Sequence, residues 1–103
     1  MSLEYARQKM EEHNLAIDAH LKALLEYEAA LDALEDAKTR AILNGLEGRN
    51  ETERKARLAE LVKDEEERVR AARTALRIAE SRLKKTKANV QLALEALRLQ
   101  QAA

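Results

Sequence analysis

The sequence predicts an all-α protein, specifically a long antiparallel two-helix hairpin of the coiled-coil type that forms one domain over residues 1–103. The chain contains no Pro and only two Gly, so little in it interrupts a helix. Charged residues make up 37% and aromatic residues 2%, and most of the remainder is Ala and Leu, as is typical of long helices. Apolar residues also recur at the spacing of a coiled-coil seam.

The first helix is predicted over residues 3–43. Ser2 can cap it, and Glu4 stands in its first turn, where a negative charge stabilises a helix. One seam column repeats every seven residues and consists of Leu3, Met10, Ile17, Leu24 and Leu31. A second column with the same repeat consists of Ala6, His13, His20, Tyr27, Leu34 and Ala41. Small residues flank this seam and keep the helix slim on one side, namely Ala16, Ala23, Ala30 and Ala37.

The turn between the helices is predicted at residues 44–50. Asn44 and Gly45 end the first helix, because Gly accepts the left-handed conformation found after a helix C-terminus. Asn50 and Glu53 have the spacing of an N-cap and its third helical residue in a capping box.

The second helix is predicted over residues 51–100. Its seam consists of Leu58, Val62, Glu65, Val69, Ala72, Leu76, Ala79, Leu83, Thr86, Val90, Ala93 and Leu97. From Val69 onward large and small residues alternate along this seam. Small residues at every second layer allow two helices to approach closely, which favours antiparallel pairing within the hairpin.

The C-terminal end of the second helix is predicted to extend beyond the first. If the chain reverses near residue 47, Leu3 lies beside residue 91, and the residues that follow overhang. The overhang contains four leucines that we interpret as oligomer or partner contacts, namely Leu92, Leu94, Leu97 and Leu99. We therefore expect self-association, most simply a dimer that forms a four-helix bundle. The same seams fit a closed hairpin or two chains that exchange helices.

Catalytic, cofactor-binding and metal-binding residues are not predicted. His13 and His20 lie about 10 Å apart along one helix and cannot share an ion, and neither follows a Glu at the spacing of a di-metal bundle motif. The acidic run at residues 64–67 points in several directions around a helix and fits a solvated face. No phosphate-binding glycine loop or nucleophile–base arrangement is present, so we expect a protein that is not an enzyme and that needs no cofactor.

Residues 68–87 form a basic tract opposed only by Glu80. Its members are Arg68, Arg70, Arg73, Arg77, Arg82, Lys84, Lys85 and Lys87. Such a tract can neutralise nucleic-acid phosphates. However, its side chains spread around the helix, acidic residues of the first helix would lie alongside, and no aromatic residue is available to stack on bases. Charge-matched packing is therefore favoured over a nucleic-acid interface, which remains the alternative.

The location is predicted to be cytoplasmic. The chain has no Cys, no signal-peptide pattern at its start and no apolar run long enough to cross a bilayer, so no membrane partner is expected.

The segment at residues 45–56, Gly-Leu-Glu-Gly-Arg-Asn-Glu-Thr-Glu-Arg-Lys-Ala, resembles a pattern in small uncharacterised phage and prophage helical-hairpin proteins. In these proteins a Gly–basic–Asn turn is followed by Arg and Ala. The resemblance implies a phage accessory protein that acts beside DNA recombination or packaging, and it implies no catalytic residues.

Two functions follow as hypotheses. The first is a non-enzymatic, self-associating adaptor or scaffold that assembles through the C-terminal leucines. The alternative is a nucleic-acid-binding accessory protein that uses residues 68–87.

Overall fold

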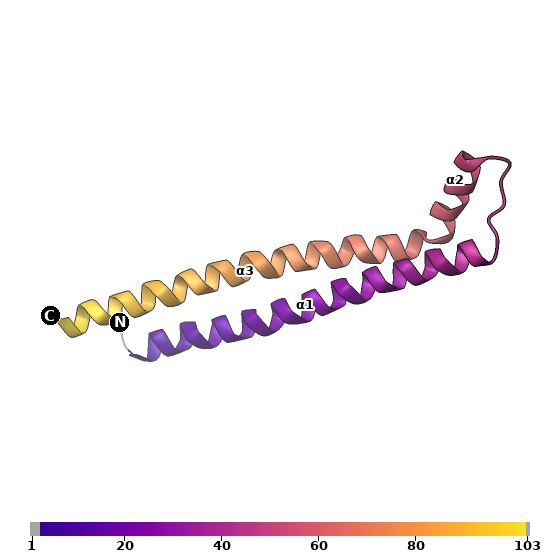
Figure 1. Cartoon of the computed structure of the whole chain (residues 1–103). Helices are drawn as coiled ribbons and strands as arrows, with labels where there is room; N and C mark the ends of the chain where they lie inside the picture. The colour runs from indigo at the N-terminus through magenta and orange to yellow at the C-terminus, as the bar shows by residue number, and fades with distance from the viewer. Residues whose placement is uncertain (1–2, 103) are drawn as a thin grey trace. The chain divides into compact units, whose positions relative to one another are not determined.

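The computed structural model describes residues 3–102, and helices are the only regular structure in this range (Figure 1). Helix α1 spans Leu3–Leu43, α2 spans Glu51–Leu61 and α3 spans Lys63–Ala102. The predicted all-α class is therefore confirmed. Ser2, the predicted cap of α1, lies outside the described residues.

Helix α1 has the predicted bounds, whereas the single second helix predicted over 51–100 is wrong: a break at Val62 divides it into α2 and α3. Val62 is not helical (φ −109°, ψ 15°), although no Gly or Pro is nearby. The Val62 N–H donates to the Leu58 carbonyl over 3.1 Å, and the Glu66 N–H donates to the Val62 carbonyl over 3.0 Å. The Val62 side chain is fully buried. The break therefore accompanies burial of one side chain and involves no helix-breaking residue.

The contacts within the chain group it into two units, which we describe separately. Unit 1 comprises residues 1–24 and 75–103, and unit 2 comprises residues 25–74. In unit 1 the first part of α1 lies beside the last part of α3, and a hydrogen bond between His13 and Thr86 joins them (Figure 1). In unit 2 a small core of Ala30, Val69 and Ala72 packs against Tyr27 and Leu34.

The connection in unit 2 confirms Asn50 as an N-cap. The Glu53 N–H donates to Asn50 Oδ1 over 2.9 Å. The Glu53 carboxylate in turn accepts from the Arg49 N–H over 2.7 Å, one residue before the cap, where a strict capping box would use the cap's own N–H. Gly45 and Gly48 both have positive φ, 85° and 152°, which suits residues without a Cβ.

The predicted seam of the second helix agrees with the observed burial. All twelve of its positions, from Leu58 to Leu97, are buried or half-buried. The alternation of large and small residues thus identified the face that turns away from solvent.

Only one of the two seam columns predicted for α1 agrees with the observed burial, namely the column that begins at Ala6. The fully buried residues of α1 are small, namely Ala6, Ala16 and Ala30. The column of large side chains is mostly exposed, with Met10 at 48% and Ile17 at 45%. Because alanine lets two helix backbones approach closely, α1 packs with its alanine-rich side inward. The column of large side chains lies next to the alanine-rich side on the helix. With the alanine-rich side inward, the large side chains lie at the edge of the contact.

The position at which the overhang of α3 is predicted to begin is also wrong. Ala93 is 4% exposed and Leu97 is half-buried, so α3 is still covered beyond residue 91. The predicted reversal near residue 47 would place His13 opposite residue 81, but it bonds to Thr86. Helix α2 has no buried residue and only Leu58 is half-buried, so most of residues 51–61 are not used for pairing and the partners of α1 lie further along the chain.

Within residues 3–102, no helix combines the length and the apolar character that a membrane span requires.

Candidate interaction surfaces

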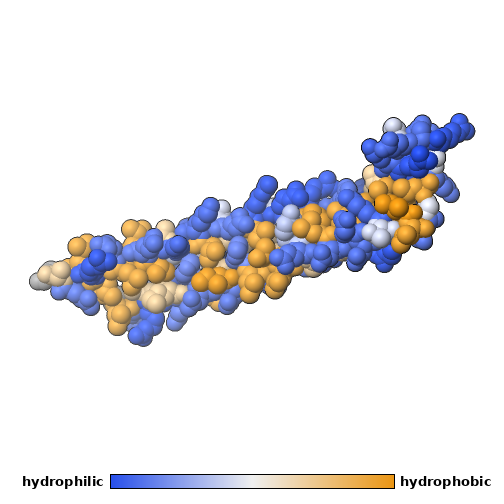
Figure 2. All heavy atoms as spheres, viewed as in Figure 1, coloured by the Kyte–Doolittle hydropathy of each residue, from blue (hydrophilic) through white to orange (hydrophobic). Residues whose placement is uncertain are grey.

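Unit 1 carries a row of large apolar side chains on the solvent side of α1. Leu3, Met10 and Ile17 repeat every seven residues, and Leu21 lies one helical turn beyond Ile17. All four side chains are exposed, at 45–60% of their full area. We call these four residues the outer stripe. Figure 2 shows hydrophobic residues interspersed with hydrophilic ones on the visible surface of this unit.

The four C-terminal leucines do not form one cluster. Leu92 and Leu99 are 69% and 65% exposed and lie seven residues apart on one face of α3, which they share with exposed Ile78. Leu94 is also exposed, but Leu97 is half-buried and lies one helical turn from buried Ala93. Leu92 and Leu99 are therefore available to a partner, whereas Leu97 belongs to the covered face.

Unit 2 exposes a second set of apolar side chains. Ile42 and Leu43 at the end of α1 and Leu61 at the end of α2 are exposed, as are Leu25 and Leu31. Large apolar side chains thus reach solvent in both units.

The part of the basic tract in unit 2 is engaged in local contacts. The guanidinium of Arg68 contacts the Glu26 carboxylate at 2.9 Å. Arg73 lies over the Tyr27 ring, 5.9 Å from its centroid. Arg70 lines a shallow groove with Leu34, Val69 and Glu66. Arg68 forms an ion pair, as charge-matched packing predicts, whereas Arg70 and Arg73 have no carboxylate contact among residues 3–102.

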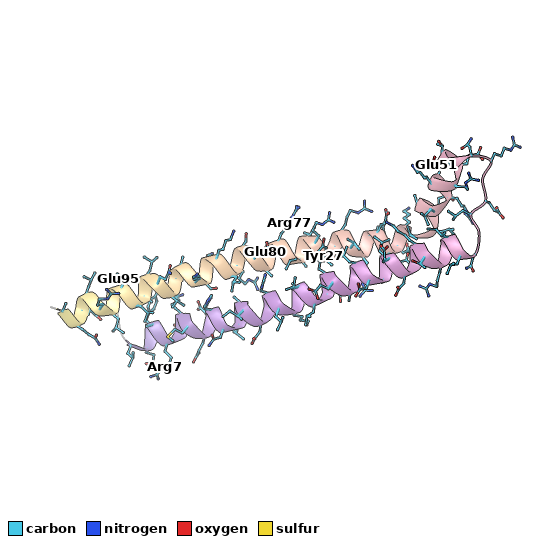
Figure 3. All side chains as sticks on the ribbon, in the orientation of Figure 1. Arg7, Tyr27, Glu51, Arg77, Glu80 and Glu95 are labelled. Carbon is cyan, nitrogen blue, oxygen red and sulfur yellow. The ribbon has the colours of Figure 1, made fainter. Side chains whose placement is uncertain are left out.

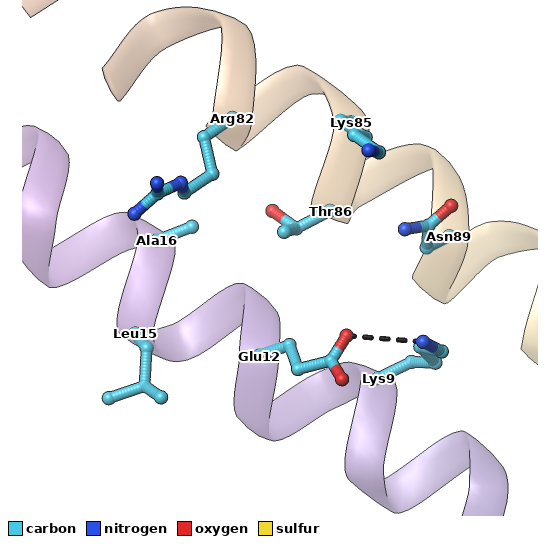
Figure 4. Close-up of a pocket in the computed structure, with 8 residues that line it drawn as sticks. All are labelled: Lys9, Glu12, Leu15, Ala16, Arg82, Lys85, Thr86 and Asn89. Carbon is cyan, nitrogen blue, oxygen red and sulfur yellow. Dashed lines mark hydrogen bonds and ion pairs between the residues drawn. The ribbon is translucent and has the colours of Figure 1, made fainter. Parts of the chain in front are cut away.

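The part of the tract in unit 1 is different. Its five members are exposed and have no carboxylate partner among residues 3–102, and they are Arg77, Arg82, Lys84, Lys85 and Lys87. In Figure 3 the Arg77 side chain points away from α1. Arg82 and Lys85, by contrast, border a groove of about 600 Å³ between α1 and α3 (Figure 4). Within the described residues, ion pairing in the basic tract is therefore confined to Arg68.

The two histidines lie on the contact side of α1, and both are half-buried. His13 Nδ1 is 2.8 Å from Thr86 Oγ1. No group of three or more His, Cys, Asp and Glu side chains within the described range is arranged to hold a metal ion. His13 has a direct role as a polar contact between two helices of unit 1.

The acidic run at residues 64–67 has a role that the sequence interpretation missed. Asp64, Glu65 and Glu66 occupy the first turn of α3. Negative charges are favourable there because the N-terminal end of a helix carries a partial positive charge. A dense acidic run inside a predicted helix could therefore have indicated a new helix start.

Comparison of this chain with models of protein families, with curated proteins and with solved structures finds no match.

Proposed function

We propose that this protein is a non-enzymatic helical scaffold whose copies associate through the outer stripe. In this proposal each chain closes as an antiparallel two-helix hairpin, and two chains form a four-helix bundle. The observation that carries the proposal is the arrangement of side chains on α1, which buries alanines and exposes large apolar residues. A helix that only had to pack within one chain would bury its large residues and expose the small ones.

Covering the outer stripe would contribute favourable free energy to association. Full burial of a large apolar side chain contributes about 1.5–3 kcal/mol. Leu3, Met10, Ile17 and Leu21 keep roughly half of their area exposed, so covering them contributes about 3–6 kcal/mol per chain, and twice that in a symmetric pair.

Charge indicates a second copy of this chain as the partner. Unit 1 carries nine basic and six acidic residues, for a net charge of +3. Unit 2 carries ten basic and thirteen acidic residues, for a net charge of −3. A two-fold pair that brings unit 1 of one chain against unit 2 of the other joins surfaces of opposite charge twice.

Sedimentation velocity over a range of protein concentrations tests the proposal. The native chain should sediment as more than a monomer. The double variant Met10→Glu with Ile17→Glu should be monomeric and retain its helical circular dichroism, because it places charges in the outer stripe without touching buried residues. The double variant Gln8→Glu with Thr39→Glu adds the same charge at exposed polar positions of α1 and should associate as the native chain does.

Two results would contradict the proposal: a native chain that remains monomeric at high concentration, or a Met10→Glu, Ile17→Glu variant that associates normally.

The C-terminal leucines are tested separately. We expect Leu92→Gln with Leu99→Gln to weaken association, because these exposed side chains extend the apolar surface of unit 1. Unchanged association of this variant would remove the C-terminal contact and leave the outer stripe as the interface.

A further inference from the structure

We propose that the groove between α1 and α3 in unit 1 binds backbone phosphates of a nucleic-acid duplex. This inference is independent of the proposed self-association. The groove is lined by residues of both helices, namely Lys9, Glu12, Leu15, Ala16, Arg82, Lys85, Thr86 and Asn89.

The groove has an excess of positive charge. Figure 4 shows Arg82 and Lys85 on the α3 side and Lys9 on the α1 side, with the Lys9–Glu12 ion pair marked. The Lys9 ammonium lies 3.2 Å from Glu12 Oε2, so this carboxylate offsets one of the three cations. The net charge of +2 matches a groove that receives phosphate groups, each of which carries one negative charge in a nucleic-acid backbone.

The donors that a phosphate needs are free. Neither Arg82 nor Lys85 has a hydrogen-bond or ion-pair partner within residues 3–102, and the same holds for the half-buried Asn89 amide. The Thr86 hydroxyl is not available, because it bonds to His13 and to the Leu83 carbonyl. A phosphate in the groove would therefore be contacted by Arg82, Lys85 and Asn89. The planar guanidinium of Arg82 suits two phosphate oxygens at once.

The surroundings of the groove favour a duplex over a single strand. Single-strand surfaces combine positive charge with aromatic side chains on which bases stack, and no aromatic residue lines this groove. Arg77, Lys84 and Lys87 lie on the same helix outside the groove and raise the positive potential around it. Backbone contacts of this kind do not depend on nucleotide sequence and weaken strongly with salt.

Fluorescence anisotropy with short labelled DNA and RNA duplexes, measured over a range of salt concentrations, tests the inference. The double variant Arg82→Ala with Lys85→Ala removes two groove cations. The matched variant Lys84→Ala with Lys87→Ala removes two exposed cations outside the groove. Because each phosphate contact contributes about 0.9 to the slope of log affinity against log salt, we expect the groove variant to lose about 2 from the slope and the matched variant to lose little. We also expect the groove variant to bind at least about tenfold more weakly at low salt, as two lost phosphate contacts imply.

Binding of either duplex with this pattern supports the groove, and comparison of the DNA and RNA arms shows which backbone it prefers. Equal losses in the two variants would overturn the inference in favour of diffuse attraction, and so would the absence of binding at low salt. Circular dichroism and sedimentation of both variants should match the native chain, which separates loss of a phosphate site from loss of fold or assembly.

Discussion

His13 on α1 donates a hydrogen bond to Thr86 on α3, with 2.8 Å between Nδ1 and Oγ1. The direction of this bond follows from the second contact of the hydroxyl. Thr86 Oγ1 donates its own proton to the Leu83 carbonyl, 3.1 Å away, so it can only accept from His13. The proton of a neutral His13 therefore resides on Nδ1. This pair forms a specific polar contact between the two helices of unit 1 and fixes their register.

Replacing Thr86 by Val should lower the free energy of unfolding by about 1 kcal/mol, because the half-buried His13 N–H loses its acceptor. Urea denaturation followed by circular dichroism measures the change. Thr74→Val is the matched control, because Thr74 is exposed on α3 and has no side-chain bond within the described residues. Equal stability of the two variants would show that the bond contributes nothing to the fold.

Replacing Ala30 by Leu should destabilise unit 2 by about 1–3 kcal/mol, since overpacking a tight contact forces the helices apart. Ala30 is 0% exposed and touches the core of Val69 and Ala72. Its neighbour Ala29 is exposed, so Ala29→Leu should change stability by less than about 0.5 kcal/mol. Thermal unfolding of both variants provides the comparison, and a tolerated Ala30→Leu would mean that the helices do not approach closely at this point.

Replacing Asn50 by Ala should cost about 1 kcal/mol of helix stability, because the Glu53 N–H loses its acceptor at the N-cap. Helix α2 buries no residue, so this loss should appear as reduced helicity of residues 51–61 rather than as global unfolding. Secondary chemical shifts from nuclear magnetic resonance measure the helicity residue by residue. Asn44→Ala, at an exposed position without a side-chain bond in the described chain, should leave α2 unchanged, and a similar effect of both changes would argue against the cap.

Replacing Gly48 by Ala should destabilise the chain more than replacing Gly45 by Ala. Both glycines have positive φ, which costs a residue with a Cβ about 1 kcal/mol or more. A Cβ at Gly48 would also lie 2.9 Å from the Arg54 backbone nitrogen, whereas one at Gly45 would meet nothing within 4 Å. Chemical denaturation of the two variants ranks them, and the reverse order would contradict the turn geometry.

The buried face of the second predicted helix was easier to predict than that of the first, although its break at Val62 was missed. Its seam alternates bulky residues such as Val69 and Leu76 with small ones such as Ala72 and Ala79, so only one face could be buried. On α1 the sequence offered two adjacent apolar columns. Periodicity alone does not say whether large or small side chains turn inward, because both satisfy the same repeat. The repeat therefore predicts Met10 and Ile17 in the seam, although the alanine side forms most of it in the structure.

Two features could not be predicted from the sequence, for different reasons: the break at Val62 and the groove of unit 1. Leu58 to Glu66 contains only residues compatible with a helix, so propensity predicts continuity, whereas the structure breaks the helix at the buried Val62. The groove requires the register of the two helices, which brings Lys9 from α1 to the same space as Arg82 and Lys85 from α3. Lys9 stood in no predicted site, and only the register shows that it belongs with the basic tract.

The interruption at Val62 also divides the chain into segments that differ in their resistance to local opening. The backbone amides of Lys63, Asp64 and Glu65 begin a new helix and have no backbone acceptor among residues 3–102, although they lie between two stretches of intact helical bonds. Such amides exchange with deuterium at rates close to those of an open chain, whereas amides deep in α3 are retained. An exchange map should therefore show strong protection in α1 and α3, weak protection in α2, which buries no residue, and a narrow fast-exchanging window just after Val62. The presence of that window would show that α2 and α3 are separate helices, and its absence would show one continuous helix.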